Sequence, residues 1–138
     1  MDHWLAFSLI ALVFWGITGN TQKVSTNHVS TEFSFLGFAA AFLPIAILTL
    51  IVFPVETALT AEVLALGVGG GILNSLGALS AFAAFKAGAK SSVAVPIMYL
   101  YPLLTVLLAR MFLDEQITAA HWAGILLAPV AAWLLSRD

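Results

Sequence analysis

The sequence predicts an all-α membrane protein, a bundle of five transmembrane helices. Of its 138 residues, 62% are hydrophobic and only 9% are charged, and the mean hydropathy is +1.05. A soluble domain usually carries about 25% charged residues because its surface must face water. So few charges cannot cover such a surface, and most of the outer face is therefore expected to meet the lipid bilayer.

Five long apolar segments support this prediction. They cover about residues 4–20, 33–53, 63–85, 92–111 and 119–135, with short connections between them. A helix needs roughly 17 to 25 residues to cross the hydrocarbon core, and all five segments qualify. Only helices and closed barrels satisfy their backbone in lipid, and runs this long without strict alternation are typical of helices. We therefore expect residues 1–138 to form one transmembrane domain.

The cations predict an orientation, because cytoplasmic loops of membrane proteins are enriched in Lys and Arg. In this order of segments, Lys23, Lys86, Lys90 and Arg137 share one side of the membrane, and only Arg110 lies on the other. This bias predicts a multi-pass protein of the cytoplasmic membrane with its N-terminus outside and its C-terminus inside. Moving one lysine would weaken the bias, so a dual topology also stays open.

The first segment ends in a polar stretch, residues 19–28, from Gly19 to His28. Gly16 and Gly19 are three residues apart and permit either a loop or a kinked helix whose polar end lines a cavity. The sequence leaves both interpretations open. In the second one, Trp15 and Asn20 line the cavity, and Gly16 is a point of conformational change.

The third segment combines small residues with one side-chain amide in its middle. Gly67, Gly71 and Ser75 fall at positions i, i+4 and i+8, so they share one helix face and predict close packing against another helix. Asn74 lies in the middle of the same segment. A side-chain amide in lipid needs a partner, so Asn74 is expected either to bond a neighbouring helix or to point into a transport pathway.

The fourth segment contains two prolines, Pro96 and Pro102, and two tyrosines, Tyr99 and Tyr101. A proline leaves the carbonyl four residues earlier without its donor, so bends are expected about one turn before each. The freed carbonyls and the two phenol groups could bind a ligand, although tyrosines that pack sideways or anchor at the interface give the same pattern. On a straight helix the tyrosines point about 200° apart, so at most one is expected to face a cavity.

The sequence gives no support to a catalytic or metal-binding function. With these boundaries no Asp, Glu, Lys, Arg or His lies in the middle of a segment, so the carboxylate that couples many carriers to protons is missing. The three histidines are scattered over both membrane faces, and the chain has no cysteine. No basic patch suggests nucleic acid. We expect neither an enzyme nor a cofactor.

Several short motifs follow one another in an order that resembles a known family. They read AFAAFKAGAKSS at residues 81–92, YLYPLLT at 99–105, FLDEQIT at 112–118 and HWAGILL at 121–127. Their order and spacing resemble the EamA domain of the drug/metabolite transporter superfamily. Phe14-Trp15-Gly16, with Lys23, is similar to the Trp-Gly motif of that family's first span. Two positions differ, because Asp114 replaces the usual Gly and Gln116 replaces the usual Arg.

The resemblance implies a transporter of small metabolites, such as amino acids, other small organic solutes or drugs, that works by alternating access. The spans with the bends and the polar side chains would then form its site. The residues expected to bind substrate are Trp15, Asn20, Asn74, Tyr99 and Tyr101, and those expected to change conformation are Gly16, Pro96 and Pro102.

Typical members of this family carry two such domains in inverted orientation, with ten helices around a central cavity. A single domain therefore implies a dimer, and the family architecture favours an inverted homodimer. The cation bias favours one orientation instead, so a parallel dimer and a separate half-sized subunit also stay open. Two other functions remain possible: a non-transporting membrane subunit that uses the face of Gly67, Gly71 and Ser75, and a translocator of lipid-like substrates, which would need lipid-facing openings between helices.

The charged corner between the last two segments is expected to be structural. Arg110 and Asp114 are four residues apart, a spacing at which opposite charges pair on a helix. Asp114 or Thr118 is expected to cap the helix that follows.

Overall fold

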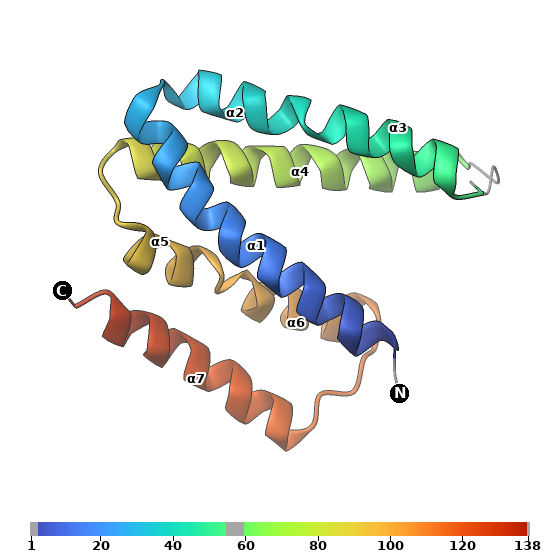
Figure 1. Ribbon diagram of the computed structural model, residues 1–138. Helices are drawn as coiled ribbons and strands as arrows, with labels where there is room; N and C mark the ends of the chain where they lie inside the picture. The colour runs from blue at the N-terminus through green and yellow to red at the C-terminus, as the bar shows by residue number, and fades with distance from the viewer. Residues whose placement is uncertain (1–2, 55–59, 138) are drawn as a thin grey trace. The chain divides into compact units, whose positions relative to one another are not determined.

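The computed structural model describes residues 3–54 and 60–137, and within these ranges it contains helices and no strand (Figure 1). Four stretches are long and apolar enough to cross a membrane, two of them each built from two consecutive helices, and the last helix is shorter and apolar. All five predicted segments are therefore helical, which confirms the fold class. The helices are α1 (His3–His28), α2 (Thr31–Ala40), α3 (Phe42–Val52), α4 (Ala61–Lys86), α5 (Ser91–Met98), α6 (Tyr101–Phe112) and α7 (Ala119–Leu135).

The polar end of the first segment is helical, because α1 continues without interruption to His28. The loop interpretation of residues 19–28 is therefore wrong. Two hydroxyls in this part of α1 bond to the helix's own backbone: Thr21 Oγ1 donates to the Thr18 carbonyl at 2.9 Å, and Thr26 Oγ1 donates to the Lys23 carbonyl at 2.8 Å. A hydroxyl that donates to a carbonyl of its own helix is satisfied locally, so it does not draw the backbone into a non-helical conformation.

The second segment, which the sequence predicted as one span, is broken at Ala41, between α2 and α3. The cause is Pro44, which has no N–H to donate to the carbonyl of Ala40. The Ala41 N–H still donates to the Gly37 carbonyl at 3.2 Å, so the chain continues in nearly the same conformation. The proline rule that was applied to the fourth segment would have predicted this break.

Hydroxyl caps fix where three helices begin. The side chains of Ser30, Thr60 and Thr118 accept hydrogen bonds from backbone N–H groups at the starts of α2, α4 and α7, at 3.2, 3.2 and 3.3 Å. Such caps satisfy one of the N–H groups that a helix start leaves without a partner. The predicted cap at Thr118 is confirmed, and Asp114 does not hold that position.

The charged corner before α7 also contains the predicted ion pair. Arg110 Nη1 and Asp114 Oδ1 are 3.6 Å apart, and both side chains are largely exposed. Asp114 has a φ of 51°, in the left-handed region that favours glycine and that Asp tolerates better than most residues. This backbone conformation explains physically why glycine suits the position.

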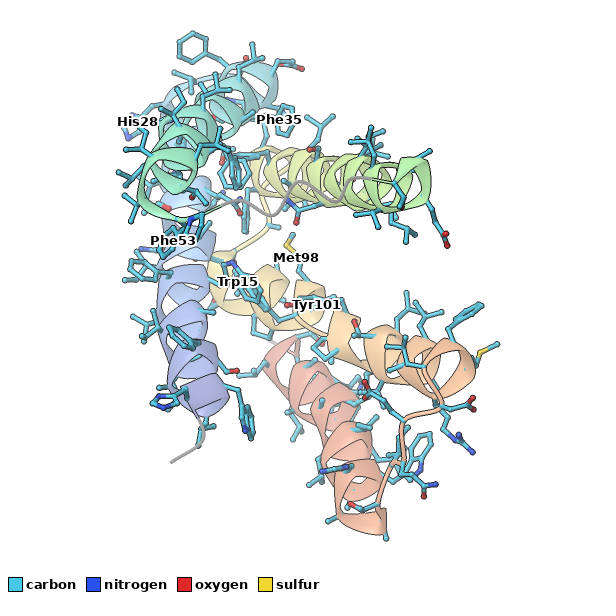
Figure 2. The ribbon with its side chains drawn as sticks, turned by 90° about the vertical axis from the view of Figure 1, so that its right-hand side faces the viewer. Trp15, His28, Phe35, Phe53, Met98 and Tyr101 are labelled. Carbon is cyan, nitrogen blue, oxygen red and sulfur yellow. The ribbon has the colours of Figure 1, made fainter. Side chains whose placement is uncertain are left out.

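The helices form two compact units, Met1–Ala87 and Gly88–Asp138. The core of the first unit lies at one end, where α1 and α4 finish and α2 begins. Phe82 and Phe85 are 2% and 1% exposed there, and the ring of Phe82 meets Phe35 and Phe38 edge-on with centroids 6.5 and 5.7 Å apart. Away from this end α1 and α4 diverge (Figures 1 and 2). Their apolar side chains remain exposed, as expected of surfaces that face lipid.

The second unit is a hairpin in which α5 and α6 run in one direction and α7 returns beside α5 (Figure 1). Ala94 and Ala132 are buried in it, and small side chains like these let two membrane helices approach closely. Lys90 and Arg137 lie at the open end of the hairpin, whereas Arg110 lies at its turn. Within this unit the cations are thus separated as the predicted orientation requires.

Candidate functional site

The fourth segment is broken between α5 and α6, at Tyr99 and Leu100. In an unbroken helix the carbonyl of Met98 would accept from residue 102, but Pro102 has no N–H to offer. The backbone unwinds locally: ψ is 15° at Tyr99 and −6° at Leu100, against about −42° in a regular α-helix. The bend expected before Pro102 is therefore confirmed. By contrast, α5 runs unbroken through Pro96.

The break brings the two tyrosines together. Their ring centroids are 6.1 Å apart, with the ring planes inclined at 44°. The expectation that they point about 200° apart is therefore wrong, because it assumed the regular rotation per residue that the break removes. Tyr99 is 37% exposed and Tyr101 is 48% exposed, so both aromatic faces are accessible on the same part of the second unit. The pair forms an amphipathic surface with two phenol groups.

The remaining predicted substrate-binding residues lie on the first unit. Trp15 and Asn20 are on α1, from which Trp15 projects in Figure 2, and Asn74 is near the middle of α4. Both asparagines are exposed, and among the described residues neither amide has a hydrogen-bond partner. Unpaired amides are costly in hydrocarbon, so each must face water, a solute or another protein surface once the protein is in a membrane.

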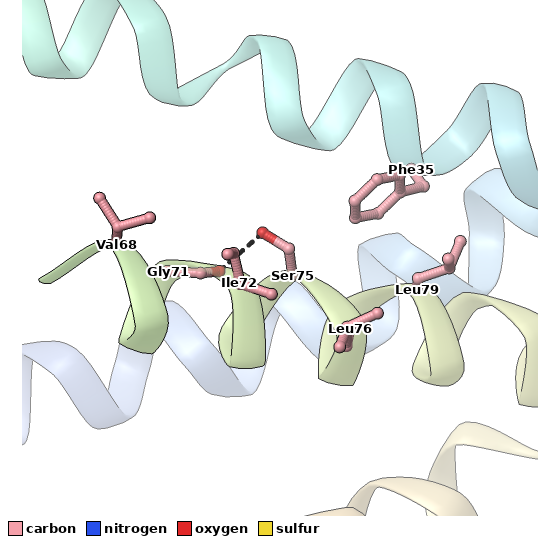
Figure 3. Close-up of a pocket in the computed structure, with 7 residues that line it drawn as sticks. All are labelled: Phe35, Val68, Gly71, Ile72, Ser75, Leu76 and Leu79. Atoms are coloured by element: carbon pink, nitrogen blue, oxygen red, sulfur yellow. Dashed lines mark hydrogen bonds between the residues drawn. The ribbon is translucent and has the colours of Figure 1, made fainter. Parts of the chain in front are cut away.

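An open apolar groove of about 450 Å³ lies between α2 and α4 (Figure 3). Its one hydroxyl, that of Ser75, donates to the Gly71 carbonyl at 2.9 Å and so adds no free donor to the groove. The groove therefore offers an almost wholly apolar surface, which suits an acyl chain or an apolar side chain better than a polar solute. Its lining residues are Phe35, Val68, Gly71, Ile72, Ser75, Leu76 and Leu79.

The small-residue face of α4 is not packed closely within the chain. A Cβ atom added at Gly67 or Gly71 would meet no atom within 4 Å, and Ser75 is exposed. The expected close helix contact is thus not formed among the described residues. The packing role of Gly67, Gly71 and Ser75 stays a prediction, now about contact with another chain.

Two lysines have a structural role that the sequence interpretation missed, since it used them only to predict orientation and to support the family resemblance. Lys23 Nζ donates to the Phe85 carbonyl at 2.9 Å. Lys86 Nζ donates to the carbonyls of Thr26 and Val29 at 3.0 and 2.9 Å. Their positions near the ends of two helices could have predicted this role. Cations near a helix C-terminus bond the last carbonyls and interact favourably with the helix dipole.

The part of the chain that the structure describes holds no group of three or more His, Asp or Glu side chains placed to bind a metal ion. The chemistry offered by the positions above is hydrogen bonding by amides and phenols, together with aromatic and apolar contact. These groups lie within stretches of the chain that are long and apolar enough to span a membrane.

Comparison with known families agrees with this description. The model of the EamA-like transporter family matches residues 3–137, which includes all seven helices. No curated protein and no solved structure gives a significant match. The match covers the chain almost from end to end, and four of the helical stretches it covers have the length and apolarity of membrane spans. The protein therefore belongs to the EamA-like transporter family.

Proposed function

We propose that the protein carries small organic solutes across the membrane by alternating access, and that the break in the fourth segment forms part of the substrate site. The observation that carries the proposal is the interruption at Tyr99 and Leu100, with the rings of Tyr99 and Tyr101 only 6.1 Å apart. Irregular backbone within a membrane is tolerated where it is buried in protein or lines a cavity. Discontinuous helices form substrate sites in many transporters for this reason.

The proposed substrates are neutral or zwitterionic and form hydrogen bonds, as amino acids do. The polar groups of the proposed site are the phenols of Tyr99 and Tyr101, and the central parts of the described spans hold no Asp, Glu, Lys, Arg or His. A site without a buried charge has no basis for strong selection of ions of one sign. The aromatic rings that carry the phenol hydroxyls add contact area for the apolar part of a solute.

Tyr101→Phe tests the site directly. The ring contact with Tyr99 is kept and only the hydroxyl is lost, so uptake at low solute concentration is expected to fall about fivefold, the equivalent of one hydrogen bond of about 1 kcal/mol. Uptake of labelled amino acids, nucleosides and organic cations into proteoliposomes is the measurement, after a thermal-shift screen has selected the solutes. Asn74→Ala is the second variant, because Asn74 is the unpaired amide of α4.

The control for Tyr101→Phe is Thr49→Val in α3. It also removes a hydroxyl from a membrane span, but that hydroxyl donates to the Ile45 carbonyl of its own helix at 2.9 Å. Its uptake is expected to equal that of the unmodified protein. If the unmodified protein moves none of these solutes above the level of empty liposomes, the proposed function is wrong.

We further propose that the second half of the transporter is a second copy of this chain, in inverted orientation. One family match spans residues 3–137, whereas typical members pair two such domains around a cavity. Two features support a protein partner: the amide of Asn74, which has no hydrogen-bond partner among the described residues, and the open positions at Gly67 and Gly71. A helix from the second copy could approach α4 closely at these glycines.

Gly71→Leu is expected to weaken this dimer without unfolding the chain. The position is open within the chain, so the added side chain meets no intrachain atom at its Cβ, whereas overpacking an interface costs about 1 to 3 kcal/mol. Gly69→Leu is the matched control, because Gly69 is equally open and lies roughly 200° away on the same helix. Dimer fraction, measured by single-molecule photobleaching in liposomes, should fall for Gly71→Leu only. Equal dimer fractions in both variants would show that the face of Gly67 and Gly71 does not form the dimer interface.

The apolar groove between α2 and α4 supports a second candidate function, the translocation of lipid-like substrates. It is open along α4, within a span, and it is lined almost entirely by apolar side chains (Figure 3). The two candidates differ in a direct assay. A lipid translocator would speed the loss of fluorescence when dithionite is added to vesicles containing a fluorescent phospholipid, whereas a solute carrier would not.

A further inference from the structure

Lys23 and Lys86 bond reciprocally across the meeting point of α1 and α4. Lys23, near the end of α1, donates to the Phe85 carbonyl in the last turn of α4. Lys86, the last residue of α4, donates to the carbonyls of Thr26 and Val29 at the end of α1. Each helix therefore supplies the cation that bonds the other helix's C-terminal carbonyls. We call this arrangement the lysine clasp.

The lysine clasp joins two ends that would otherwise repel each other. The last carbonyls of a helix have no intrahelical donor and carry the negative end of its dipole, so two C-termini placed together are unfavourable without cations between them. Among the described residues, neither lysine forms an ion pair, and both donate hydrogen bonds to these carbonyls. Thr26 and Phe85 are 2% and 1% exposed, so water has little access to these two residues, whereas the bond to the Val29 carbonyl is exposed.

The opposite ends of the same two helices are not joined. From the lysine clasp, α1 and α4 diverge toward their N-terminal ends (Figures 1 and 2). Side chains far from the clasp on both helices are strongly exposed, such as Phe7 on α1 and Leu66 on α4, each 70% exposed. The core residues of the unit, in contrast, gather beside the clasp. Within this unit, the described contacts between α1 and α4 are thus concentrated at the end that holds the clasp.

We propose that the lysine clasp is a pivot: it holds the C-terminal ends of α1 and α4 together while α1 swings at its N-terminal end. This inference rests on the proposed function, since alternating access needs helices that open on one side while they remain joined on the other. Lys23 and Lys86 are then positioning residues that touch no substrate. They restrict the movement of α1 to one end of the pair.

Distances between paired spin labels test the pivot in nanodiscs, and the chain suits this because it has no native cysteine. One pair, at Asn27 and Ala87, reports on the clasp end, and the other, at Phe7 and Leu66, reports on the free end; all four residues are exposed. Labelled protein is diluted with unlabelled protein so that only distances within one chain are read. Each pair is measured in the unmodified background, in Lys86→Met, and in Lys86→Arg, which keeps a cation and donors.

The expected result is a narrow distance distribution at the clasp end and a broad one at the free end. Lys86→Met should lose the narrow distribution at the clasp end, and Lys86→Arg should keep it. Lys90→Met is the control for charge, because Lys90 is exposed, close in sequence and bonds no described residue through its side chain. A clasp-end distribution that is unchanged in Lys86→Met, or that broadens equally in Lys90→Met, would overturn the pivot.

The pivot and the proposed function fail in different ways. The distances do not depend on any substrate, so they test the pivot even if no solute is transported. If the unmodified protein transports a solute, Lys86→Met should slow the maximal rate of uptake and leave the half-saturating concentration unchanged, because the lysine does not touch the solute. A change in the half-saturating concentration alone would contradict a positioning role.

Discussion

Pro102→Ala is expected to lower solute uptake at least about tenfold, which corresponds to about 1.4 kcal/mol, while it makes the protein more resistant to heat. Alanine supplies the N–H that the Met98 carbonyl lacks, so α5 and α6 can join into one continuous helix. Regular helix geometry would then rotate Tyr99 and Tyr101 apart and remove the paired rings. Alanine also favours a helix interior over proline by up to about 3 kcal/mol.

The opposite signs of these two effects make the prediction specific. A substitution that merely damages the protein lowers uptake and thermal stability together, whereas this one should lower uptake and raise the melting temperature in detergent. Pro129→Ala is the matched control, because Pro129 lies within α7, which runs through it unbroken. Its uptake should be unchanged. Full uptake by Pro102→Ala would show that the break has no role in transport.

Lys86→Met is expected to lower the free energy of unfolding by about 2 kcal/mol. The variant leaves the carbonyls of Thr26 and Val29 without their charged donor, and hydrogen bonds to charged groups contribute about 1.5 to 3 kcal/mol each. The figure counts only the bond to Thr26, because the bond to Val29 is exposed and water can replace the lysine there. Unfolding by added denaturing detergent, followed by tryptophan fluorescence, is the measurement.

Lys90→Met again provides the comparison for this loss of stability. It removes the same charge from the same part of the chain, and the Lys90 side chain bonds no described residue. Its unfolding curve should match that of the unmodified protein. If the two methionine variants unfold alike, the effect comes from net charge, and the bonds to α1 contribute nothing measurable.

The positions and the helical state of the five segments could be predicted from the sequence because they depend on local properties. Apolar length alone indicated the spans, and the predicted segment 119–135 coincides with α7. The cap at Thr118 and the ion pair of Arg110 with Asp114 also followed from spacing along the chain. Likewise, the missing N–H of Pro102 predicted the break that follows Met98.

The candidate site was predicted less completely. The sequence identified Tyr99 and Tyr101 as candidates, but it placed them on opposite sides of a straight helix, whereas the unwound backbone puts their rings 6.1 Å apart. The direction of a side chain depends on the accumulated rotation of the backbone, so a change of ψ at two residues is enough to reverse it. The packing face of Gly67 and Gly71 could not be tested within one chain, where these positions are open.

By itself, the sequence determined that the protein is an all-helical membrane protein, where its spans lie and which family it resembles. Only the tertiary structure showed how the helix ends are joined. Lys23 and the Phe85 carbonyl are 62 residues apart in the chain, and Lys86 and the Thr26 carbonyl are 60 apart. A cation near a helix C-terminus always favours bonding to carbonyls, but the packing of Phe82 and Phe85 decides which helix supplies them.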